Sequence, residues 1–217
     1  MKLLHIIASP RGEKSRTLHV STEFLNNLST SNPGLEIDHL DLFKVPLPDI
    51  YESPTEAKNE LMNNGSIENQ FKTHWDEIAK YSKEFLSYDF YLISSPMWNF
   101  SVPYKLKHYI DVIMQAGILF SFTDIRPVGP ALNKKMFCIT SRGSDYSKSG
   151  PINHFDFQEI YLRSIVGMVG ITDISFIHAQ PLDLAPGITQ IQLNITKEEA
   201  KTLAQNSSNS NTFKITA

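Results

Sequence analysis

Short apolar runs alternate with segments of helical periodicity along most of this chain, and that alternation limits the folds open to it. The runs are rich in β-branched and aromatic residues and span residues 3–8, 35–40, 90–94, 136–140 and 171–177. Regular strand–helix alternation predicts a parallel sheet with helices on both faces. Five strands in one continuous series therefore predict a doubly wound α/β fold with one five-stranded parallel sheet.

The segments between and beyond the strands define the expected domain. Helices are expected over about residues 15–28, 71–85, 106–114 and 157–168. Two insertions interrupt the alternation, a proline-rich one at 43–65 and another at 117–130. Insertions of this length are commonly functional lids or interface elements. We expect a single domain over residues 1–182.

The remaining segment, residues 183–217, reads as a C-terminal extension that is partly mobile. Residues 197–205 have the composition of a short helix. Residues 206–211 are rich in Ser and Asn, which is typical of a mobile stretch near a terminus. No role for this extension follows from its residues.

Composition argues against several classes of function. The chain has 217 residues, a net charge of −3 and a pI near 6.2, so it lacks the basic footprint of a nucleic-acid-binding protein. No apolar run has the length of a membrane span or the layout of a signal peptide, so we expect a cytoplasmic protein without a membrane partner. One cysteine, Cys138, excludes a disulfide framework, and the seven histidines are too scattered to predict a metal site.

Polar turns of unusual composition follow three of the five expected strands. In an open parallel sheet with strand order 2-1-3-4-5, strands 1, 3 and 4 are neighbours, and ligands bind beyond their carboxyl ends. The turns after these strands are residues 9–17, 95–100 and 141–144. The turn after strand 2 holds no comparable cluster. We therefore expect one ligand site where the three turns converge.

The first turn has the groups that an anion needs. A helix that begins near Ser15 directs free backbone N–H groups and the positive end of its dipole toward this turn. Ser9, Ser15 and Thr17 add hydroxyl donors, and Arg11, Lys14 and Arg16 add positive charge. The alternative is that Ser15 only caps the helix and the basic side chains are solvated. No P-loop or GxGxxG pattern is present.

The second turn suits a flat aromatic ligand. Pro96 restricts its backbone, and Met97, Trp98 and Phe100 are large apolar groups in a loop. Asn99 can both donate and accept hydrogen bonds at the edge of a heterocycle. The alternative is a loop that packs onto its own helix.

The third turn would reach the opposite edge of the same ring. Gly143 allows backbone N–H groups to approach a ligand closely. Its neighbours Ser141, Arg142 and Ser144 supply further polar groups. Together the three turns predict a site for a flat ring that carries a phosphate.

At these residues the sequence resembles the FMN-dependent NADH-azoreductases, a branch of the flavodoxin-like quinone reductases. The matching stretches are the opening strand with its turn, SSPMWNFSVPYKLKHYID (94–111), AGILFSFT (116–123), ITSRG (139–143) with Gly150-Pro151, and GMVGITDISFIHAQ (167–180). The resemblance covers about residues 2–182. It implies a flavodoxin-like fold and a homodimer with one FMN per subunit near the interface.

The resemblance also implies an activity and roles for residues. NADH or NADPH would reduce the flavin and leave, and a quinone or azo compound would then take the electrons in a ping-pong, two-electron reaction. The implied phosphate ligands are Ser9, Ser15, Arg16 and Thr17; the implied ring contacts are Pro96, Met97, Trp98, Asn99, Phe100, Ser141, Arg142, Gly143 and Ser144. The implied substrate-pocket residues are Asn99, Phe120, Phe122 and Met168. The chemistry belongs to the flavin, so no catalytic side chain is expected.

The chain departs from the family pattern at four of these positions. Trp98 stands where the family frequently has tyrosine, and Ser144 stands where it usually has a second glycine. Both residues are compatible with the FMN contacts that the resemblance implies. Phe122 stands where the family often has a tyrosine that lines the substrate side. Met168 replaces a phenylalanine that, in the family, is expected to reach the pocket of the neighbouring subunit. The substrate preference of the family therefore cannot be transferred. A flavodoxin-type electron carrier and a flavin-free binding protein stay open as alternatives.

Overall fold

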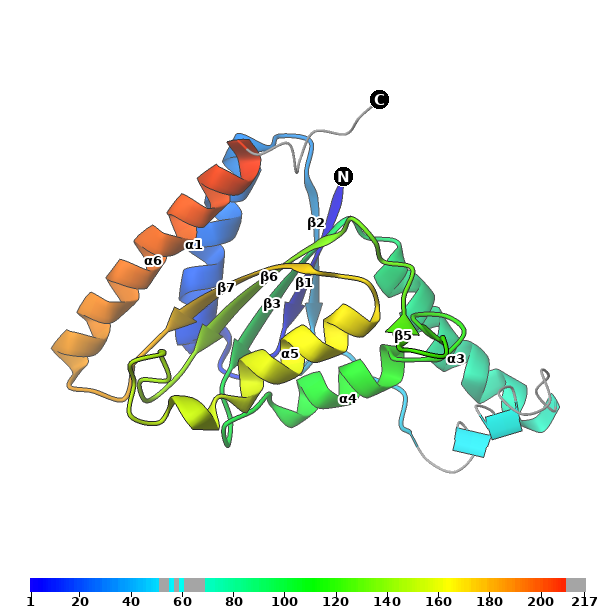
Figure 1. The fold of residues 1–217 in the computed structure, drawn as a ribbon. Coiled ribbons are helices and arrows are strands. Elements are labelled where there is room, and N and C mark those ends of the chain that lie inside the picture. The colour runs from blue at the N-terminus through cyan, green and yellow to red at the C-terminus, as the bar shows by residue number, and fades with distance from the viewer. Residues whose placement is uncertain (51–54, 57–58, 61–68, 210–217) are drawn as a thin grey trace.

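Three layers make up the fold: helices, a central sheet, and helices again (Figure 1). The computed structural model describes residues 1–50, 55–56, 59–60 and 69–209. The strands are β1 (Lys2–Ile7), β2 (Glu36–Asp41), β3 (Phe90–Pro96), β4 (Ser121–Phe122), β5 (Pro127–Val128), β6 (Lys135–Ser141) and β7 (Asp173–Ala179). The helices are α1 (Arg16–Ser31), α3 (Asn69–Leu86), α4 (Tyr104–Ile113), α5 (Phe157–Met168) and α6 (Pro186–Asn209), with single-turn 3-10 helices at η1 (Gly12–Lys14) and η2 (Asn153–Phe155).

The main sheet has five parallel strands in the order β2-β1-β3-β6-β7. The expected five-stranded parallel sheet is therefore confirmed. The expected order 2-1-3-4-5 is matched only loosely, because the insertion at 117–130 contains two further strands, β4 and β5, which pair as a separate antiparallel hairpin. Strands β3 and β6 are almost continuously apolar and buried because helices cover both of their faces.

Each face of the sheet has its own hydrophobic core. Helices α3, α4 and α5 cover one face, where they pack around side chains such as Ile93, Leu106 and Met136. Helices α1 and α6 cover the other face, where the ring of Phe24 lies 4.8 Å from that of Phe137. In Figure 1 the two groups of helices lie on opposite sides of the strands. Helices on both faces are thus present, as the alternation predicted.

The C-terminal segment is more ordered than its sequence indicates. The helix expected at 197–205 is part of the 24-residue helix α6, which lies beside α1 (Figure 1). Residues 206–209, expected to be mobile, belong to this helix, and 210–217 lie outside the described residues. The inner face of α6 is made largely of small side chains, which allow close packing but give a weak apolar pattern. The division of the chain at residue 182 stays a prediction.

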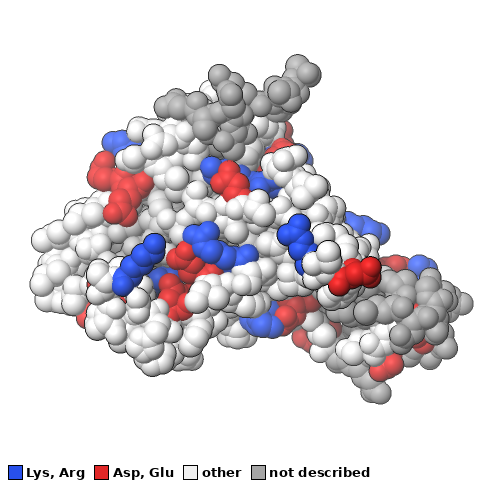
Figure 2. Space-filling view, viewed as in Figure 1, with Lys and Arg blue, Asp and Glu red and all other residues white. Residues whose placement is uncertain are grey.

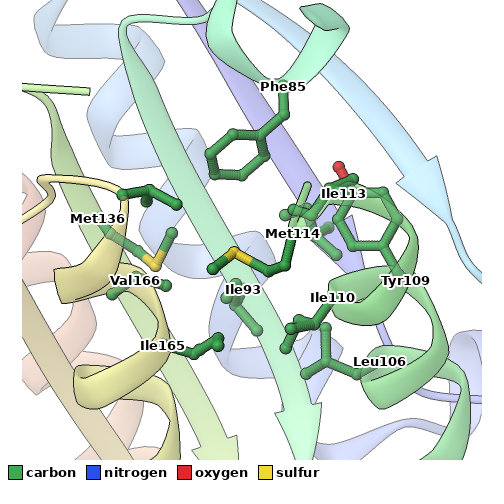
Figure 3. A pocket seen from close by; sticks show the side chains of 12 residues that line it. Phe85, Ile93, Leu106, Tyr109, Ile110, Ile113, Met114, Met136, Ile165 and Val166 are labelled. Atoms are coloured by element: carbon green, nitrogen blue, oxygen red, sulfur yellow. The ribbon is translucent and has the colours of Figure 1, made fainter. Parts of the chain in front are cut away.

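A small apolar void lies inside the core between α4, α5 and the sheet (Figure 3). Its free volume is about 20 Å³, and its lining is entirely apolar in surface. A void of this size has room for about one water molecule but offers it no polar partners. This void is therefore a packing defect of the core and no candidate for a ligand site.

The surface carries mixed charge. On the face drawn in Figure 2, basic and acidic side chains are interspersed rather than gathered by sign. None of the described helices is both long and apolar enough to cross a membrane.

We predict that α6 contributes to the stability of the same folded unit as the sheet. Leu193 is buried against the α1 face, so Leu193→Ala should lower the free energy of unfolding by about 2–5 kcal/mol. Ile191, two residues earlier on the same helix, is 61% exposed, and Ile191→Ala should change it by less than about 0.5 kcal/mol. Urea unfolding measures both; equal effects would contradict the packing of α6.

Candidate functional site

The three polar turns line one cleft at the carboxyl edge of the sheet. This convergence follows from the topology, because β1, β3 and β6 are adjacent parallel strands that all end at the same edge. The cleft has a free volume of about 150 Å³. Its lining residues are Ser9, Pro10, Arg11, Ser15, Arg16, Thr17, Pro96, Met97, Trp98, Ser141, Arg142, Gly143 and Asp183. Ten of the thirteen residues expected to bind the cofactor are in this set; Asn99, Phe100 and Ser144 are not.

The first turn gathers hydroxyl and amide groups at the start of α1. Ser15 is the N-cap of α1, and its Oγ accepts a hydrogen bond from the backbone N–H of Leu18. The buried Ser9 Oγ donates to the same oxygen at 2.8 Å. The N–H groups of Arg16 and Thr17 lie in the first helical turn, where no helical carbonyl precedes them as an acceptor. This end of the cleft therefore suits an anion.

A short hydrogen bond joins the first turn to the third. Thr17 Oγ1 and Ser141 Oγ lie 2.6 Å apart, although 124 residues separate them in the chain. The backbone N–H of Met97 in the second turn donates to the carbonyl of Ser141 at 2.9 Å. The third turn thus holds both of the others, which gives the cleft a defined shape.

Arg16 has partners inside the protein that the sequence did not reveal. Its Nη1 donates to the carbonyl of Leu182 at 2.6 Å, and its Nη2 forms an ion pair with Asp183 at 3.0 Å. Asp183 also lines the cleft, so its carboxylate offsets part of the charge of Arg16. The charge of Arg16 is therefore partly offset, and Arg11 and the amide and hydroxyl donors of the first turn are the other groups here that attract an anion.

The second turn is a tight, strained reversal of the backbone. Trp98 and Ser101 exchange two backbone hydrogen bonds of 2.9 Å, and the two residues between them have positive φ angles, 48° for Asn99 and 69° for Phe100. Two-residue turns of this kind usually contain glycine, and a bulky residue at positive φ costs free energy. The ring of Phe100 stacks on that of Phe155 at 4.9 Å, which helps to hold the turn.

Aromatic side chains that the sequence analysis missed pack beside Trp98. The ring centroids of Phe43 and Tyr104 lie 6.3 and 6.5 Å from that of Trp98, although neither residue lines the cleft itself. The turn after the second strand thus supports Trp98 through one residue, Phe43, and holds no cluster of its own. Phe43 gave no recognisable signal in the sequence, because its contact with Trp98 depends on the sheet order.

Arg142 is a buried cation beside the cleft rather than an exposed one. Its side chain is 1% exposed, and its Nη1 lies 2.7 Å from Asp156 Oδ2. Asp156 also caps α5 by accepting from the N–H of Glu159. Burial lowers the pKa of the Arg142 guanidinium, and Asp156 opposes that effect. Within the described part of the chain, its Nε and Nη2 have no hydrogen-bond partner, so the third turn has donors to spare.

None of the four expected substrate-side residues lines this cleft, although Asn99 directly follows the lining residue Trp98. Phe120 is buried in the α4–α5 core, and Phe122 lies on the exposed hairpin with its ring 5.3 Å away. Met168 ends α5 and packs at the margin of the same core. Helices α4 and α5 return from the carboxyl edge toward the amino edge of the sheet, so their last residues lie far from the turns (Figure 1). None of these three residues lines the cleft of its own chain, so their place on the substrate side stays a prediction.

The described residues hold no group of three or more His, Cys, Asp and Glu side chains that could bind a metal ion. The described lining of the cleft has amide and hydroxyl donors at the start of α1 and the aromatic ring of Trp98 in the second turn, groups that suit an organic ligand with an anionic end.

Comparison with known families agrees with this geometry. A family model described as a flavodoxin-like fold matches residues 1–205, so the chain belongs to that family. An FMN-dependent NADH:quinone oxidoreductase of Pseudomonas fluorescens is 32% identical over 94% of this chain and 96% of its own length. An FMN-dependent NADH:quinone oxidoreductase of Desulfotalea psychrophila is 35% identical over 94% of this chain and 96% of its own length.

Solved structures give the same picture of the fold. An azoreductase from Bacillus anthracis superimposes with a TM-score of 0.85 at 25% identity, over 95% of this chain and 99% of that one. An FMN-dependent NADH-azoreductase from the same species, solved with FMN, has a TM-score of 0.85 at 24% identity, over 96% of this chain and all of the other. Within the flavodoxin-like family, the chain is thus a member of the FMN-dependent NADH:quinone oxidoreductase and azoreductase branch.

We predict that Gly143 is required by the Arg16–Asp183 ion pair. A Cβ at residue 143 would lie 2.1 Å from Asp183 Oδ2, so Gly143→Ala must displace the carboxylate. The expected cost is about 1–2 kcal/mol of unfolding free energy. In an Asp183→Ala background the carboxylate is gone, and the Cβ of residue 183 would lie 3.5 Å from the new Cβ of residue 143. This is an ordinary contact, so the cost of Gly143→Ala should nearly vanish. Chemical denaturation of the four proteins of this cycle measures the coupling; additive effects would refute it.

Proposed function

We propose that this protein is an FMN-dependent NAD(P)H oxidoreductase that reduces quinones, azo compounds or both by two-electron transfer in a ping-pong sequence. The observation that carries the proposal is the meeting of three turns on one cleft with an anion-binding end and an aromatic end. Relatives that match 94% of the chain are named FMN-dependent NADH:quinone oxidoreductases, which favours an enzyme over a flavodoxin-type electron carrier. The choice between NADH and NADPH stays open.

The phosphate of FMN would be held at the start of α1. The donors that line the cleft are the backbone N–H groups of Arg16 and Thr17 and the hydroxyls of Ser15 and Thr17, while Ser9 gives its hydroxyl proton to Ser15 Oγ and so orients that donor. Hydrogen bonds to a charged acceptor contribute about 1.5–3 kcal/mol each, so two or three of them suffice to hold a phosphate firmly. Arg16 would add less than a free arginine, because Asp183 and Leu182 already engage its guanidinium.

The ring of FMN would lie against the second and third turns. Met97 and Trp98 offer an apolar wall, and Ser141, Arg142 and Gly143 of the third turn line the same cleft. Asn99, Phe100 and Ser144 flank these residues, and we keep them as contacts of the ring edge. Bound FMN supplies hydride acceptance and donation; the chain orients it and keeps water from its face.

One chain offers too little space for the whole ligand. The free volume of about 150 Å³ lies below the about 300–1,000 Å³ usual for small-molecule sites. The cleft therefore fits the phosphate and its chain, with the ring extending toward Trp98 and Phe100, which are both partly exposed. A second subunit would supply the missing wall, so this shortfall supports a homodimer.

Exposed apolar side chains on α5 and on the β4–β5 hairpin support the same proposal. Helix α5 exposes Phe157 and Ile160, and the β4–β5 hairpin segment exposes Phe122 and Ile125, the last of them 92% exposed. We propose that these side chains contact a second copy, where Phe122 and Met168 of one subunit approach the cleft of the other. Exposed apolar residues gathered in this way commonly mark protein–protein contacts. We further propose that the dimer works in the cytoplasm.

The enzyme proposal predicts a colour change. Under anaerobic conditions, excess NADH or NADPH should bleach the visible flavin absorbance of the purified protein, and a quinone added afterwards should restore it. A stopped-flow spectrophotometer measures both steps. Protein that binds FMN but never bleaches with either nucleotide would leave only the electron carrier.

The phosphate end predicts a loss of affinity on Ser15→Ala. Removal of one donor, and of the cap that holds the first turn of α1, should weaken FMN binding by about 1–3 kcal/mol, or about 5- to 150-fold. Titration of apoprotein with FMN, followed by quenching of flavin fluorescence, gives the dissociation constant. Ser87→Ala removes an exposed serine that bonds only its own helix end at Glu84 and is the matched control. Equal affinities would exclude the proposed phosphate site.

The dimer proposal predicts which helix lies at the interface. Ile160→Glu places a charge on the exposed face of α5 and should convert the protein to a monomer at micromolar concentration. Ile191→Glu places the same charge on α6, where a similar isoleucine is 61% exposed, and should leave the dimer intact. Sedimentation velocity distinguishes the two forms. A monomeric wild type, or dissociation by Ile191→Glu alone, would contradict the proposal.

A further inference from the structure

Gln158, in the first turn of α5, is a fully buried polar residue that does not itself line the cofactor cleft. Its Nε2 donates to the carbonyl of Pro96 at 2.9 Å, 62 residues earlier in the chain. Pro96 lines the cleft at the start of the second turn. We propose that Gln158 is a positioning residue for the flavin ring, which it acts on through the second turn. This inference rests on the proposed placement of the ring against that turn.

The direction of this hydrogen bond is fixed by chemistry. A backbone carbonyl can only accept, so the side-chain atom of Gln158 that faces the oxygen of Pro96 must be the amide nitrogen. The Oγ of Ser95 also donates to this carbonyl, at 3.0 Å. Ser95 precedes Pro96 in the same strand, whereas Gln158 belongs to a helix. The bond from Gln158 therefore ties the second turn to a separate element of the fold.

The bond fixes one end of a peptide unit whose other end is fixed by the third turn. The N–H of Met97 donates to the carbonyl of Ser141 at 2.9 Å. The carbonyl of Pro96 and the N–H of Met97 belong to one planar unit, so the two hydrogen bonds together set its rotation. This unit leads directly into Met97 and Trp98, the apolar wall of the cleft. Gln158 thus helps to set where that wall lies.

The helix that carries Gln158 is itself anchored beside the cleft. Asp156 caps α5 and forms an ion pair of 2.7 Å with Arg142 of the third turn. Further along the helix, Leu162 and Val166 are buried in the core that covers the sheet. The second turn is therefore held by a packed helix, and precise placement of a ligand needs support of this kind.

Folding stability alone does not account for a glutamine at this position. The Oε1 of Gln158 is buried and has no hydrogen-bond partner among the residues that the structure describes. A buried polar atom without a partner costs free energy, whereas an apolar side chain of similar size would avoid that cost. What the amide provides instead is the bond from its nitrogen to the second turn.

Titration of the apoprotein with FMN and with riboflavin tests the proposal in Gln158→Met, which keeps the length of the side chain and removes the donor. We expect both flavins to bind at least about 5-fold more weakly than to the wild type, because the ring that they share loses a fixed wall. The ratio of the two affinities should stay within about 2-fold of the wild-type ratio, since the phosphate end is separate. The visible circular dichroism of bound FMN should change, because it reports the surroundings of the ring.

Two further variants separate positioning from a general loss of stability. Gln115→Met removes another buried glutamine, whose Nε2 donates to the carbonyls of Asp111 and Val112 near the end of α4. It should leave both flavin affinities and the visible circular dichroism unchanged. Gln158→Asn keeps an amide but shortens the side chain by one methylene, so it should lose flavin affinity as Gln158→Met does, even where Gln158→Met fails to fold.

The outcomes distinguish this proposal from the proposed function. Wild-type affinities in Gln158→Met or Gln158→Asn would overturn the positioning role, as would an equal loss in Gln115→Met or a loss confined to FMN. A wild-type protein that binds neither flavin would instead refute the proposed function, and the positioning role with it.

Discussion

The hydrogen bond between Thr17 and Ser141 is the interaction on which the candidate site depends most. It joins the first turn of α1 to the end of β6 at 2.6 Å, across the central strands of the sheet. Parallel strands bring their carboxyl ends to one edge, but they leave the turns beyond them free to diverge. This bond, and the backbone bond from Met97 to Ser141, keep all three turns around one cleft. The Ser9–Ser15 pair then sets the anion-binding end, because it fixes where α1 begins.

Much of this arrangement could be predicted from the sequence, because it follows from the alternation of strands and helices. Five strands of the expected kind require adjacent carboxyl ends, so Ser9, Met97 and Gly143 had to meet. The partners of charged side chains could not be predicted in this way. Arg16 pairs with Asp183, 167 residues later, and Arg142 pairs with Asp156 on the next helix, and both contacts depend on how loops fold over the sheet. Phe43 was missed for the same reason.

The positions of two expected substrate-side residues follow from the path of the chain. Phe122 follows α4 and Met168 ends α5, and both helices run back along the sheet away from the turns, so neither residue lines the cleft of its own chain. The exposure of Phe122 and the small volume of the cleft would both be explained by the proposed second subunit, which would complete the site. The length of α6 was underestimated from the sequence, because alanines rather than a strong stripe of large apolar residues pack it against α1.

The central claim is that the start of α1 recognises the phosphate of a flavin whose ring lies against the other two turns. Titration of the apoprotein with FMN and with riboflavin, which has the same ring and no phosphate, tests it most directly. The account predicts that FMN binds at least about 100-fold more tightly, since two charge-assisted hydrogen bonds are lost with the phosphate. Equal affinity for the two flavins would show that the turn after β1 does not hold the phosphate and would contradict the account.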